Sequence, residues 1–396
     1  MSIQELTLDQ LGTVSRGRSR HRPRDAAFLY GGPYPFVQTG DVKKAALYLR
    51  DYEQTYSEAG LEQSKLWPTG TLCITIAANI AETAILGIDA CFPDSVIGFI
   101  ADPLKADARF VKYLFDAALK VRFKAFTQGA AQDNLSQEKL LSIRFPVPKL
   151  NVQKTIADIL SAYDDLIENN RRRIGLLEAA ARLLYREWFV YFRFPGHEHV
   201  KITNGLPESW EPRTLADVVN VVKEMVKPSD FADDDVHIGL EHIPRRSFTL
   251  SDWEPAEDLA SGKTRFHEGD ILFGKIRPYF HKVGFTLRAG LASSDAIVMR
   301  VKEEVDWPLV VCTTASDRFV AVASKTVREG SKMPRADWNV LKKYPVPRPS
   351  STILQMFNEN VIPITAQCKS LALQNRALEE ARDLLLPRLM SGEIAV

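Results

Sequence analysis

The sequence contains few cysteines and no long apolar run, and both absences narrow the class of protein. The four cysteines, Cys73, Cys91, Cys312 and Cys368, are scattered without close pairs. This spacing argues against a disulfide framework or a zinc site and predicts reduced thiols in the cytoplasm. No stretch reaches the ~18 consecutive apolar residues that a transmembrane helix needs, and the polar start of the chain lacks the apolar segment of a secretory signal.

An excess of charge of either sign is also missing. Lysine and arginine together number 51 and aspartate and glutamate 50, so the formal net charge is +1. A nucleic-acid ligand therefore requires the basic residues to be concentrated on part of the surface. The hydrophobic fraction of 45% is ordinary for a globular protein, and a chain of 396 residues has room for roughly two or three domains.

Complete catalytic motifs are the third absence. Nothing resembles the Asn-Pro-Pro-Tyr box of an adenine methyltransferase or a glycine-rich dinucleotide fingerprint. Residues 269–276 approach a phosphate-binding loop, but Ile276 stands where a serine or threonine would hold magnesium. Residues 197–199, His-Glu-His, lack further ligands nearby and are interpreted as a solvated linker. We therefore expect no catalytic residues and no metal site.

Two long stretches carry the heptad spacing of paired helices. In residues 151–192 and again in residues 352–392, apolar side chains alternate at spacings of four and three. Such a seam predicts helices that need a partner helix, and the single asparagine within each seam would fix the register. The alternative is two unrelated surface helices, each packed on its own domain. The predicted seam consists of Ile156, Leu160, Ile167, Asn170, Ile174, Leu177 and Leu184 with Phe357, Val361, Ile364, Leu371, Asn375, Leu378 and Leu385.

The second half of the sequence resembles the first at an offset of about 200 residues, the kind of long period that indicates duplication. Residues 145–148, Phe-Pro-Val-Pro, correspond to residues 344–347, Tyr-Pro-Val-Pro. Residues 177–184 likewise correspond to residues 378–385. Each match is weak alone, and the common order and near-constant offset carry the inference.

The predicted fold class is α+β, with two strand-rich domains that alternate with two long helices. The short β-like runs broken by proline and glycine suit strand-rich globules, and the helices are expected to pack as an antiparallel coiled coil in a pseudo-twofold repeat. A protein with such symmetry suits a ligand with two halves, such as duplex DNA with two half-sites. The predicted boundaries are 1–148 for the first domain, 149–194 for the first helix, 195–204 for a linker, 205–347 for the second domain and 348–396 for the second helix.

These features resemble the specificity subunits of type I restriction–modification systems over essentially the whole chain. Besides the repeat, the resemblance rests on Leu140-Leu141 and residues 145–148 before the first helix, Trp188-Phe189 and residues 192–196 at its exit, Gly205-Leu206-Pro207-Glu208-Ser209-Trp210, Gly269-Asp270-Ile271-Leu272 and Leu389-Met390-Ser391-Gly392. The first domain departs from the pattern at residues 68–71, Pro-Thr-Gly-Thr, which replace the usual Pro-Gly-Asp.

The resemblance implies a non-catalytic subunit in which each globule is a target recognition domain that reads one half of a split sequence in double-stranded DNA. The helix pair would fix the length of the unread spacer. Each half would dock one methyltransferase subunit, which binds S-adenosylmethionine and methylates a flipped adenine. Restriction subunits, which use ATP and magnesium, would join that core. No cofactor is expected in this chain itself.

Reading DNA requires donors and acceptors for base edges and cations for phosphates. Residues 274–282 interleave cations with aromatics, residues 325–335 are basic, and residues 127–134 are rich in amides that can pair with adenine. Residues 16–24 contain five arginines and are too rich in glycine and proline for a helix. The candidate DNA-binding residues are Lys275, Arg277, Tyr279, His281, Lys282, Lys325, Arg328, Ser331, Lys332, Arg335, Thr127, Gln128, Gln132, Asn134, Arg16, Arg18 and Arg20.

Two of the basic segments also have an alternative interpretation. Residues 274–282 could be an ordinary solvated hairpin. Residues 16–24 could be a flexible arm on phosphate or in a minor groove, or a solvated tail. Two other functions also stay open: a coiled-coil scaffold that bridges proteins without reading DNA, and an NTP-hydrolysing enzyme that uses Gly269–Lys275.

Overall fold

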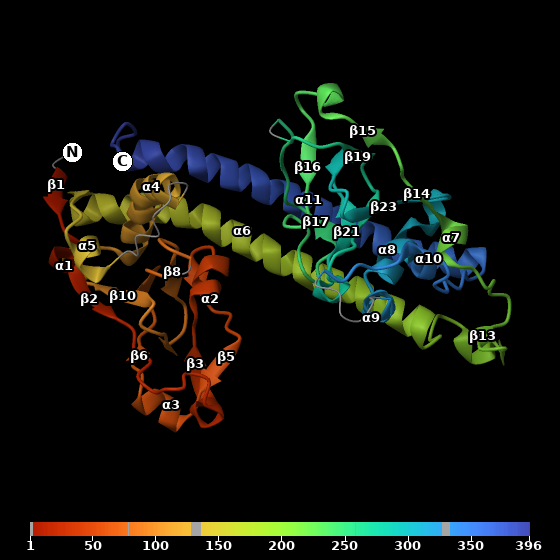
Figure 1. The fold of residues 1–396 in the computed structure, drawn as a ribbon, viewed down its shortest axis with the longest axis horizontal. Coiled ribbons are helices and arrows are strands. Elements are labelled where there is room, and N and C mark those ends of the chain that lie inside the picture. The colour runs from red at the N-terminus through yellow and green to blue at the C-terminus, as the bar shows by residue number, and fades with distance from the viewer. Residues whose placement is uncertain (1–2, 78, 128–135, 258, 327–332) are drawn as a thin grey trace. The chain divides into compact units, whose positions relative to one another are not determined.

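The chain divides into two compact units, each a strand-rich globule with parts of two long helices. The computed structural model describes residues 3–77, 79–127, 136–257, 259–326 and 333–396. The first unit comprises Met1–Glu168 and Ala377–Val396, and the second comprises Asn169–Arg376. The division falls within both long helices, α6 (Leu150–Tyr185) and α11 (Ser351–Met390) (Figure 1).

The first unit is built on a five-stranded sheet of order β2-β10-β7-β8-β4 and a four-stranded sheet of order β5-β3-β9-β6, with β1 paired to β11. Its elements are β1 (Ile3–Leu6), α1 (Leu8–Leu11), β2 (Gly12–Arg16), η1 (Ala27–Leu29), β3 (Tyr30–Phe36), α2 (Thr39–Lys44), β4 (Tyr48–Leu49), β5 (Gln54–Tyr56), α3 (Glu58–Glu62), β6 (Leu66–Trp67), β7 (Leu72–Thr75), β8 (Thr83–Leu86), β9 (Ala90–Cys91), β10 (Val96–Ala101), α4 (Ala108–Thr127), α5 (Gln137–Leu141) and β11 (Phe145–Pro148).

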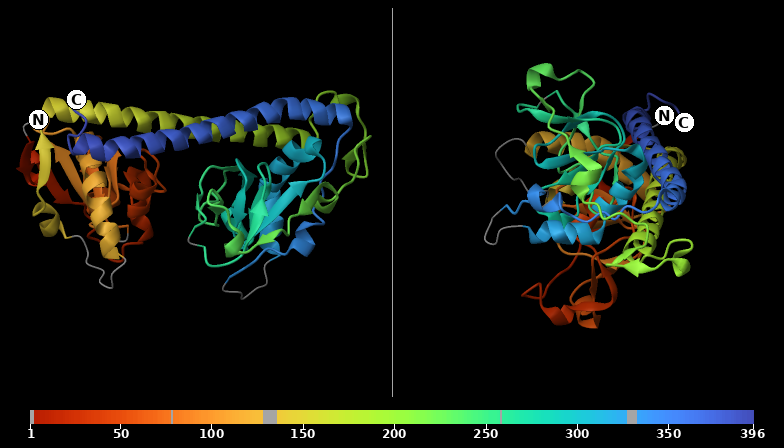
Figure 2. Two further views of the ribbon diagram at one scale, coloured as in Figure 1. Left: turned by 90° about the horizontal axis from the view of Figure 1, so that it is seen from above. Right: turned by 90° about the vertical axis from the view of Figure 1, so that its right-hand side faces the viewer.

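Helix α4 covers one face of the five-stranded sheet (Figure 2). Phe110 and Leu114, one turn apart on the helix, are buried in a cluster with Ile74 and Ile97 from the strands. This is the apolar stripe that anchors an amphipathic helix on a sheet. On β10, Gly98 has no side chain because a Cβ atom there would lie 2.5 Å from the ring of Trp67, so the two sheets pack closely at this point.

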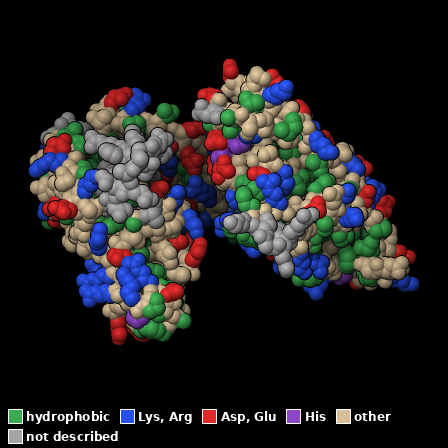
Figure 3. All heavy atoms as spheres, in the orientation of Figure 1, with side chains coloured by type: hydrophobic (Ala, Val, Ile, Leu, Met, Phe, Trp, Pro, Cys, Tyr) green, Lys and Arg blue, Asp and Glu red, His purple; other side chains and the backbone are tan. Residues whose placement is uncertain are grey.

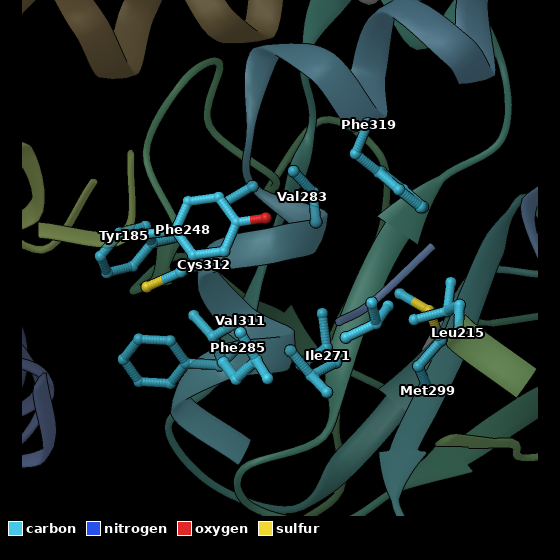
Figure 4. Close-up of a cluster of buried hydrophobic side chains, with 14 of the residues drawn as sticks. Tyr185, Leu215, Phe248, Ile271, Val283, Phe285, Met299, Val311, Cys312 and Phe319 are labelled. Carbon is cyan, nitrogen blue, oxygen red and sulfur yellow. The ribbon is translucent and has the colours of Figure 1, made fainter. Parts of the chain in front are cut away.

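The second unit has a five-stranded sheet of order β14-β23-β20-β21-β17 and another of order β15-β19-β22-β16-β18, with β12 paired to β13. Its elements are η2 (Arg186–Val190), η3 (His197–His199), β12 (Ile202–Thr203), β13 (Leu206–Pro207), α7 (Leu215–Val218), β14 (Val219–Val221), β15 (Met225–Val226), η4 (Pro228–Asp230), β16 (Val236–Ile238), β17 (Thr249–Leu250), β18 (Glu254–Pro255), β19 (Lys263–Phe266), β20 (Ile271–Gly274), η5 (Pro278–Phe280), β21 (Val283–Thr286), β22 (Gly290–Ala292), β23 (Ala296–Val301), η6 (Glu304–Asp306), α8 (Trp307–Thr314), α9 (Asp317–Lys325) and α10 (Trp338–Leu341). Figure 4 shows strand side chains such as Ile271 and Phe285 gathered with Val311 of α8 and Phe319 of α9.

The two units repeat one topology. In each main sheet all neighbouring strands are antiparallel except the last pair, which is parallel: β8 with β4 in the first unit and β21 with β17 in the second. A short helix precedes the first strand of each sheet, and Thr7 and Thr214 close the same type of capping box on it. The predicted α+β class and internal repeat are therefore confirmed.

The two long helices run in opposite directions within each unit. In the second unit, Nδ2 of Asn170 donates hydrogen bonds to Oδ1 of Asn375 and Oε1 of Gln374, both at 3.0 Å, and the ring of Phe189 lies 4.8 Å from that of Phe357. Residues later in the first helical segment therefore contact residues earlier in α11, as they do in an antiparallel pair. The predicted antiparallel helix pair is confirmed.

In the first unit, a buried carboxylate joins the helices to the globule. Asp164, 1% exposed, accepts a hydrogen bond from Nη1 of Arg382 on α11 at 2.5 Å and another from the hydroxyl of Tyr113 on α4 at 2.5 Å. Burial, and then the neighbouring Asp164 carboxylate, raise the pKa of Tyr113. Arg382 therefore occupies an apolar position of the heptad pattern because Asp164 faces it.

The predicted seam residues all lie on covered faces of their helices. Ile156, Leu160, Ile167, Asn170, Phe357, Val361, Leu371 and Asn375 are buried, and Ile174, Leu177, Leu184, Ile364, Leu378 and Leu385 are partly buried. Among the described residues, no helix combines the length and the apolar character that a bilayer crossing requires.

Candidate nucleic-acid interface

In the second unit, the basic segment after β20 forms a tight turn that other segments hold in place. Arg277 and His281 adopt left-handed backbone conformations, with φ of +48° and +55°, on either side of the single 3₁₀ turn η5. The amide of Arg277 donates to the carbonyl of Pro334 at 2.8 Å, and the amide of Arg246 donates to the carbonyl of His281 at 3.0 Å. The turn therefore has a fixed conformation.

The exposed surface of this turn is formed by Arg277 and Tyr279, together with Arg245 from the neighbouring segment. The guanidinium of Arg245 lies 4.0 Å from the ring centre of Phe280, and the guanidinium of Arg277 lies 6.0 Å from the same ring centre. Both arginines are exposed, and Tyr279 is 55% exposed. Stacking on an aromatic ring restrains an arginine without neutralising it, so this cluster can bind phosphate or a base edge.

Arg245 was not among the residues predicted from the sequence. It follows Pro244 in a segment about thirty residues before the predicted basic turn, and the isolated bridge between Arg245 and Lys282 brings the two together. The sequence signal for this site was the pair Arg245-Arg246, directly before the β-like run at Phe248. The contact between Arg245 and Phe280 could not be predicted, because the two residues lie far apart in the sequence.

The remaining predicted residues of the turn, Lys275, His281 and Lys282, are less exposed than Arg277 and Tyr279, and the last two hold the turn in place. Burial lowers the pKa of Lys275, of His281 and of Lys282. The ammonium of Lys282 donates to the carbonyl of Leu240, and Nε2 of His281 bonds the carbonyl of Ala315 at 2.9 Å. His281 is 5% exposed, so its ring supports the turn from below.

Part of the second predicted basic segment adjoins the same turn. Arg335 is exposed, forms an isolated bridge with Ile276 and makes an ion pair with Asp295 at 3.1 Å. Lys325, the last residue of α9, is exposed. The predicted residues Arg328, Ser331 and Lys332 lie outside the described residues, as do Gln128, Gln132 and Asn134 of the amide-rich segment; Thr127 is the last residue of α4.

In the first unit, the arginine run after β2 is bound to the globule along its backbone. The amide of Arg18 donates to the carbonyl of Phe92 at 3.0 Å. The amides of Arg20 and His21 both donate to Oε1 of Gln63, at 2.6 and 3.0 Å. At Gly17 a Cβ atom would lie 2.3 Å from the carbonyl oxygen of Phe92. The run is therefore not the detached arm or tail considered from the sequence.

The side chains of this fixed segment point outward as a row of cations. Arg16, Arg18 and Arg20 are exposed, and Figure 3 shows lysine and arginine side chains gathered over the end of the first unit that carries α3 and β3. Arg24 is the exception, because its guanidinium bonds both carboxylate oxygens of Asp94, at 2.9 and 3.0 Å. Each globule thus presents a group of arginines on a restrained backbone.

The second unit also contains a cleft of about 500 Å³ beside the carboxyl end of α6. Four arginines and two tyrosines line it, but no lysine. The lining residues are Ala179, Arg182, Leu183, Tyr185, Arg186, Val190, Tyr191, Arg246, His281, Cys312, Ala315, Ser316, Asp317 and Arg318.

The near-match to a phosphate-binding loop is a buried strand. Ile271–Gly274 form β20, which pairs with β21 and β23. Asp270 is 3% exposed and binds Arg300 through two hydrogen bonds of 2.7 and 2.9 Å. A strand inside a sheet cannot wrap around a triphosphate, so the NTP-hydrolysing alternative fails.

Comparison with known proteins shows which proteins the chain resembles. Residues 2–179 match the type I restriction modification DNA specificity domain. The chain is 24% identical over 397 residues to the type I restriction enzyme MjaIX specificity subunit of Methanocaldococcus jannaschii, covering 93% of this chain and 88% of that one. It is 23% identical over 365 residues to the EcoDI specificity subunit of Escherichia coli, covering 84% and 80%. Residues 2–179 thus carry a DNA specificity domain of the type I restriction–modification kind, and the chain over most of its length is similar to type I specificity subunits.

The fold of this chain is shared with a protein of known structure. The crystal structure of the S subunit of a type I restriction–modification system from M. genitalium has a TM-score of 0.57 at 15% identity, covering 98% of this chain and 96% of that chain. The specificity subunits to which this chain is similar are non-catalytic components, and this similarity confirms the prediction that the chain is not an enzyme.

Proposed function

We propose that this chain is a specificity subunit that reads a bipartite sequence in double-stranded DNA, with one half-site for each globule. In this proposal residues 1–148 and 205–347 are the two target recognition domains, residues 149–194 and 348–396 are the spacer helices, and residues 195–204 are a linker. The observation that carries the proposal is the restrained arginine cluster around Phe280, where Arg245 and Arg277 share one ring.

In the second domain, Arg277, Arg245 and Tyr279 contact the DNA, and Arg335 extends the surface. An arginine can bind the O6 and N7 atoms of guanine with two hydrogen bonds, or it can bind a phosphate. The left-handed backbone at Arg277 and the stacking on Phe280 reduce the freedom lost on binding. His281 and Lys282 act indirectly, because they hold the turn, and Lys275 remains a proposed contact.

In the first domain, Arg16, Arg18 and Arg20 bind phosphates. The backbone of Arg16 pairs with Ile97 in the sheet, and the amides of Arg18 and Arg20 bond to Phe92 and Gln63, so the charges are placed before the DNA arrives. Each phosphate contact releases counterions and adds to affinity without adding sequence information. The amide-rich residues Thr127, Gln128, Gln132 and Asn134 remain the proposed base readers of this domain, and Lys325, Arg328, Ser331 and Lys332 remain proposed contacts of the second.

The helix pair sets the number of unread base pairs between the half-sites. A buried asparagine pair such as Asn170 and Asn375 favours one register, because any slip leaves both amides unpaired. Insertion of one heptad into each helix should therefore change the spacer and leave the half-sites unchanged.

The partners are two methyltransferase subunits and, in the complete system, restriction subunits. S-adenosylmethionine, ATP and magnesium belong to those partners. We assign the cleft beside α6 to the methyltransferase, with an acidic segment flanked by an apolar side chain as its occupant. Arginine and tyrosine are enriched and lysine is depleted at protein interfaces. Arg182, Arg186, Arg246 and Arg318 outnumber the one acid of the cleft, Asp317.

Selection from a random pool of duplex DNA, with the chain co-expressed with its methyltransferase, tests the proposal. We expect one enriched motif made of two short sequences separated by a spacer of fixed length. Enrichment of a single continuous motif would contradict the two-domain reading. Stable binding of the methyltransferase without any enriched sequence would instead support a scaffold that does not read DNA.

A further inference from the structure

Three side chains with metal-binding atoms meet at the edge of the second sheet of the second unit. His237 lies on β16, Glu254 on β18 and His242 in the turn that follows β16. Each offers one ligand atom, and these atoms lie within 4.8 Å of one another. His237 and Glu254 are direct cross-strand partners, and the amide of His242 donates to the carbonyl of Gly239 at 3.2 Å, which folds the turn back toward the strands.

We propose that His237, His242 and Glu254 bind one divalent transition-metal ion of the Zn²⁺ class, with water in the remaining position. Nδ1 of His237 lies 2.9 Å from Oε1 of Glu254, and Nε2 of His242 lies 3.9 Å from Oε2. A tetrahedral ion with bonds of about 2.0–2.1 Å keeps its donors about 3.3 Å apart. These two distances lie on either side of that value, and the donors of the two imidazoles lie within 4.8 Å of each other, so side-chain movements would complete the site.

The charges of the group favour a cation. Within the described parts of the chain, the ion-pair contacts of Glu254 are with the two histidines and not with any lysine or arginine. A carboxylate beside two imidazoles, without a basic side chain to neutralise it, is a mixed nitrogen and oxygen donor set that suits zinc.

The environment is partly enclosed, as a stabilising metal site requires. The His237 side chain is 7% exposed, that of His242 12% and that of Glu254 48%. Nε2 of His237 is buried without a hydrogen-bond partner. The low exposure of the two histidines restrains their rings, and the more exposed carboxylate leaves access for an ion and a water molecule.

Binding has a cost at each histidine. At His237 the ion replaces the hydrogen bond between Nδ1 and Glu254, and the ring proton moves to Nε2, which is buried without a partner. At His242, Nδ1 accepts a hydrogen bond from the amide of Gly239 at 3.0 Å, so the neutral ring carries its proton on Nε2, toward Glu254. Coordination through Nε2 moves that proton to Nδ1 and breaks the bond from Gly239. One neutral hydrogen bond is worth roughly fivefold in an equilibrium constant, which a bond from the imidazole to the ion offsets.

The ion would brace the turn that carries Arg245. Residues 239–246 contact the proposed DNA-binding turn through Lys282, whose ammonium donates to the carbonyl of Leu240, and through the amide of Arg246. His242 lies in the middle of this segment, so fixing it fixes the position of Arg245 over Phe280. This consequence for DNA rests on the proposed function, whereas the metal site itself does not.

Zinc titration of the chelator-treated full chain, in complex with its methyltransferase where needed for solubility, tests the site. We expect one equivalent of Zn²⁺ beyond that bound by the methyltransferase alone and a higher thermal midpoint with zinc. His242→Ala and Glu254→Gln should each weaken this binding at least tenfold. His199→Ala removes an exposed histidine of the His197–His199 motif and should leave it unchanged.

Two results would overturn the proposal: zinc binding that His242→Ala leaves intact, or zinc binding that His199→Ala removes. If the wild-type chain takes up no zinc while the DNA selection still yields a bipartite motif, the metal site is refuted and the proposed function stands. If zinc binds with the expected variant pattern but no motif is enriched, the site is supported and the DNA-reading function fails.

Discussion

Glu178 on α6 and Thr249 on β17 are joined by two hydrogen bonds within the second unit. Oε1 of Glu178 accepts from the amide of Thr249 at 3.0 Å and from its hydroxyl at 2.7 Å. The same oxygen lies 3.1 Å from the amide of Phe248 and 2.8 Å from the hydroxyl of Ser247. The carboxylate is 2% exposed, and it pins the helix to the edge strand of the sheet.

We predict that Glu178→Gln lowers the free energy of unfolding by about 1.5–3 kcal/mol, because hydrogen bonds to a charged acceptor become bonds to a neutral amide. Glu178→Ala should cost about 3–5 kcal/mol, since it leaves several buried donors and Arg182 without their acceptor. Urea unfolding at neutral pH measures both. Glu359→Gln, at an exposed position of α11, is the matched control, and equal losses in Glu178→Gln and Glu359→Gln would contradict the prediction.

The asparagine pair between the helices should behave as a coupled unit. Asn170→Leu leaves Asn375 beside an apolar side chain and should cost about 1–3 kcal/mol, the penalty of an unpaired buried polar group. The double variant Asn170→Leu/Asn375→Leu should recover most of that loss, because both amides are then replaced by packed side chains. A double-mutant cycle measures this coupling. Additive losses from the two single substitutions would show that the bond of 3.0 Å does not contribute.

Much of the architecture could be predicted from the sequence, because it depends on local periodicity. The heptad spacing through Ile156 and Leu160 is a property of one stretch of chain, and it predicts the helix α6. The same reasoning predicts α11. Charged residues are scored as solvent-facing by any periodicity argument. The burial of Asp164 and Glu178 was therefore invisible, since their partners Arg382 and Thr249 lie far along the chain.

The candidate sites were only partly predictable for a similar reason. Composition alone marked Arg18 and Arg277, but it could not show that Gln63 fixes the first or that Arg245 accompanies the second. The metal group depends on the pairing of β16 with β18. A spacing of 17 residues between His237 and Glu254 matches no local metal motif. The contiguous His197–His199 motif resembles a metal site in the sequence, but it lies exposed in the structure.

Arg277→Ala and Arg245→Ala should each weaken DNA binding through one half-site only. If the arginine contacts a base, the loss should be about 1–3 kcal/mol and should relax selectivity at one position. If it contacts a phosphate, affinity should fall evenly over all sequences, and the salt dependence should decrease by about one counterion. Equilibrium binding to oligonucleotides mutated in one half-site at a time separates these cases. Lys223→Ala, exposed in the same unit, is the control, and equal losses at both half-sites would contradict the assignment.

The buried ring of His281 should make the second unit sensitive to acid. Burial is the main cause that lowers the pKa of His281 below its ordinary value, so the folded protein keeps the ring neutral. As the pH falls below about 6.5, the unfolded chain takes up a proton that the folded chain does not. The free energy of unfolding should therefore fall with decreasing pH, by up to about 1.4 kcal/mol per pH unit from this group.

His281→Asn should flatten that dependence between about pH 7 and 5. Asparagine tolerates the left-handed backbone at this position, and its amide can still donate to the carbonyl of Ala315. Urea unfolding at a series of pH values measures the slope. His199→Asn, whose side chain is 85% exposed, should keep the wild-type slope. An unchanged slope in His281→Asn would show that another group governs the acid sensitivity.

The cleft beside α6 predicts a charge-dependent contact with the methyltransferase. Arg186→Glu reverses a charge at its rim, and Leu183→Asp places a carboxylate at an apolar side chain that is 50% exposed. Both should repel an acidic occupant, since like charges brought together at an interface are costly, and each should weaken complex formation at least tenfold. Arg173→Glu makes the same charge change at an exposed position of α6 outside the cleft. Isothermal titration of the two subunits compares the affinity of the three variants, none of which alters the predicted DNA-binding residues. If Arg173→Glu loses as much affinity as Arg186→Glu, the methyltransferase responds to the overall charge of this region rather than to the cleft.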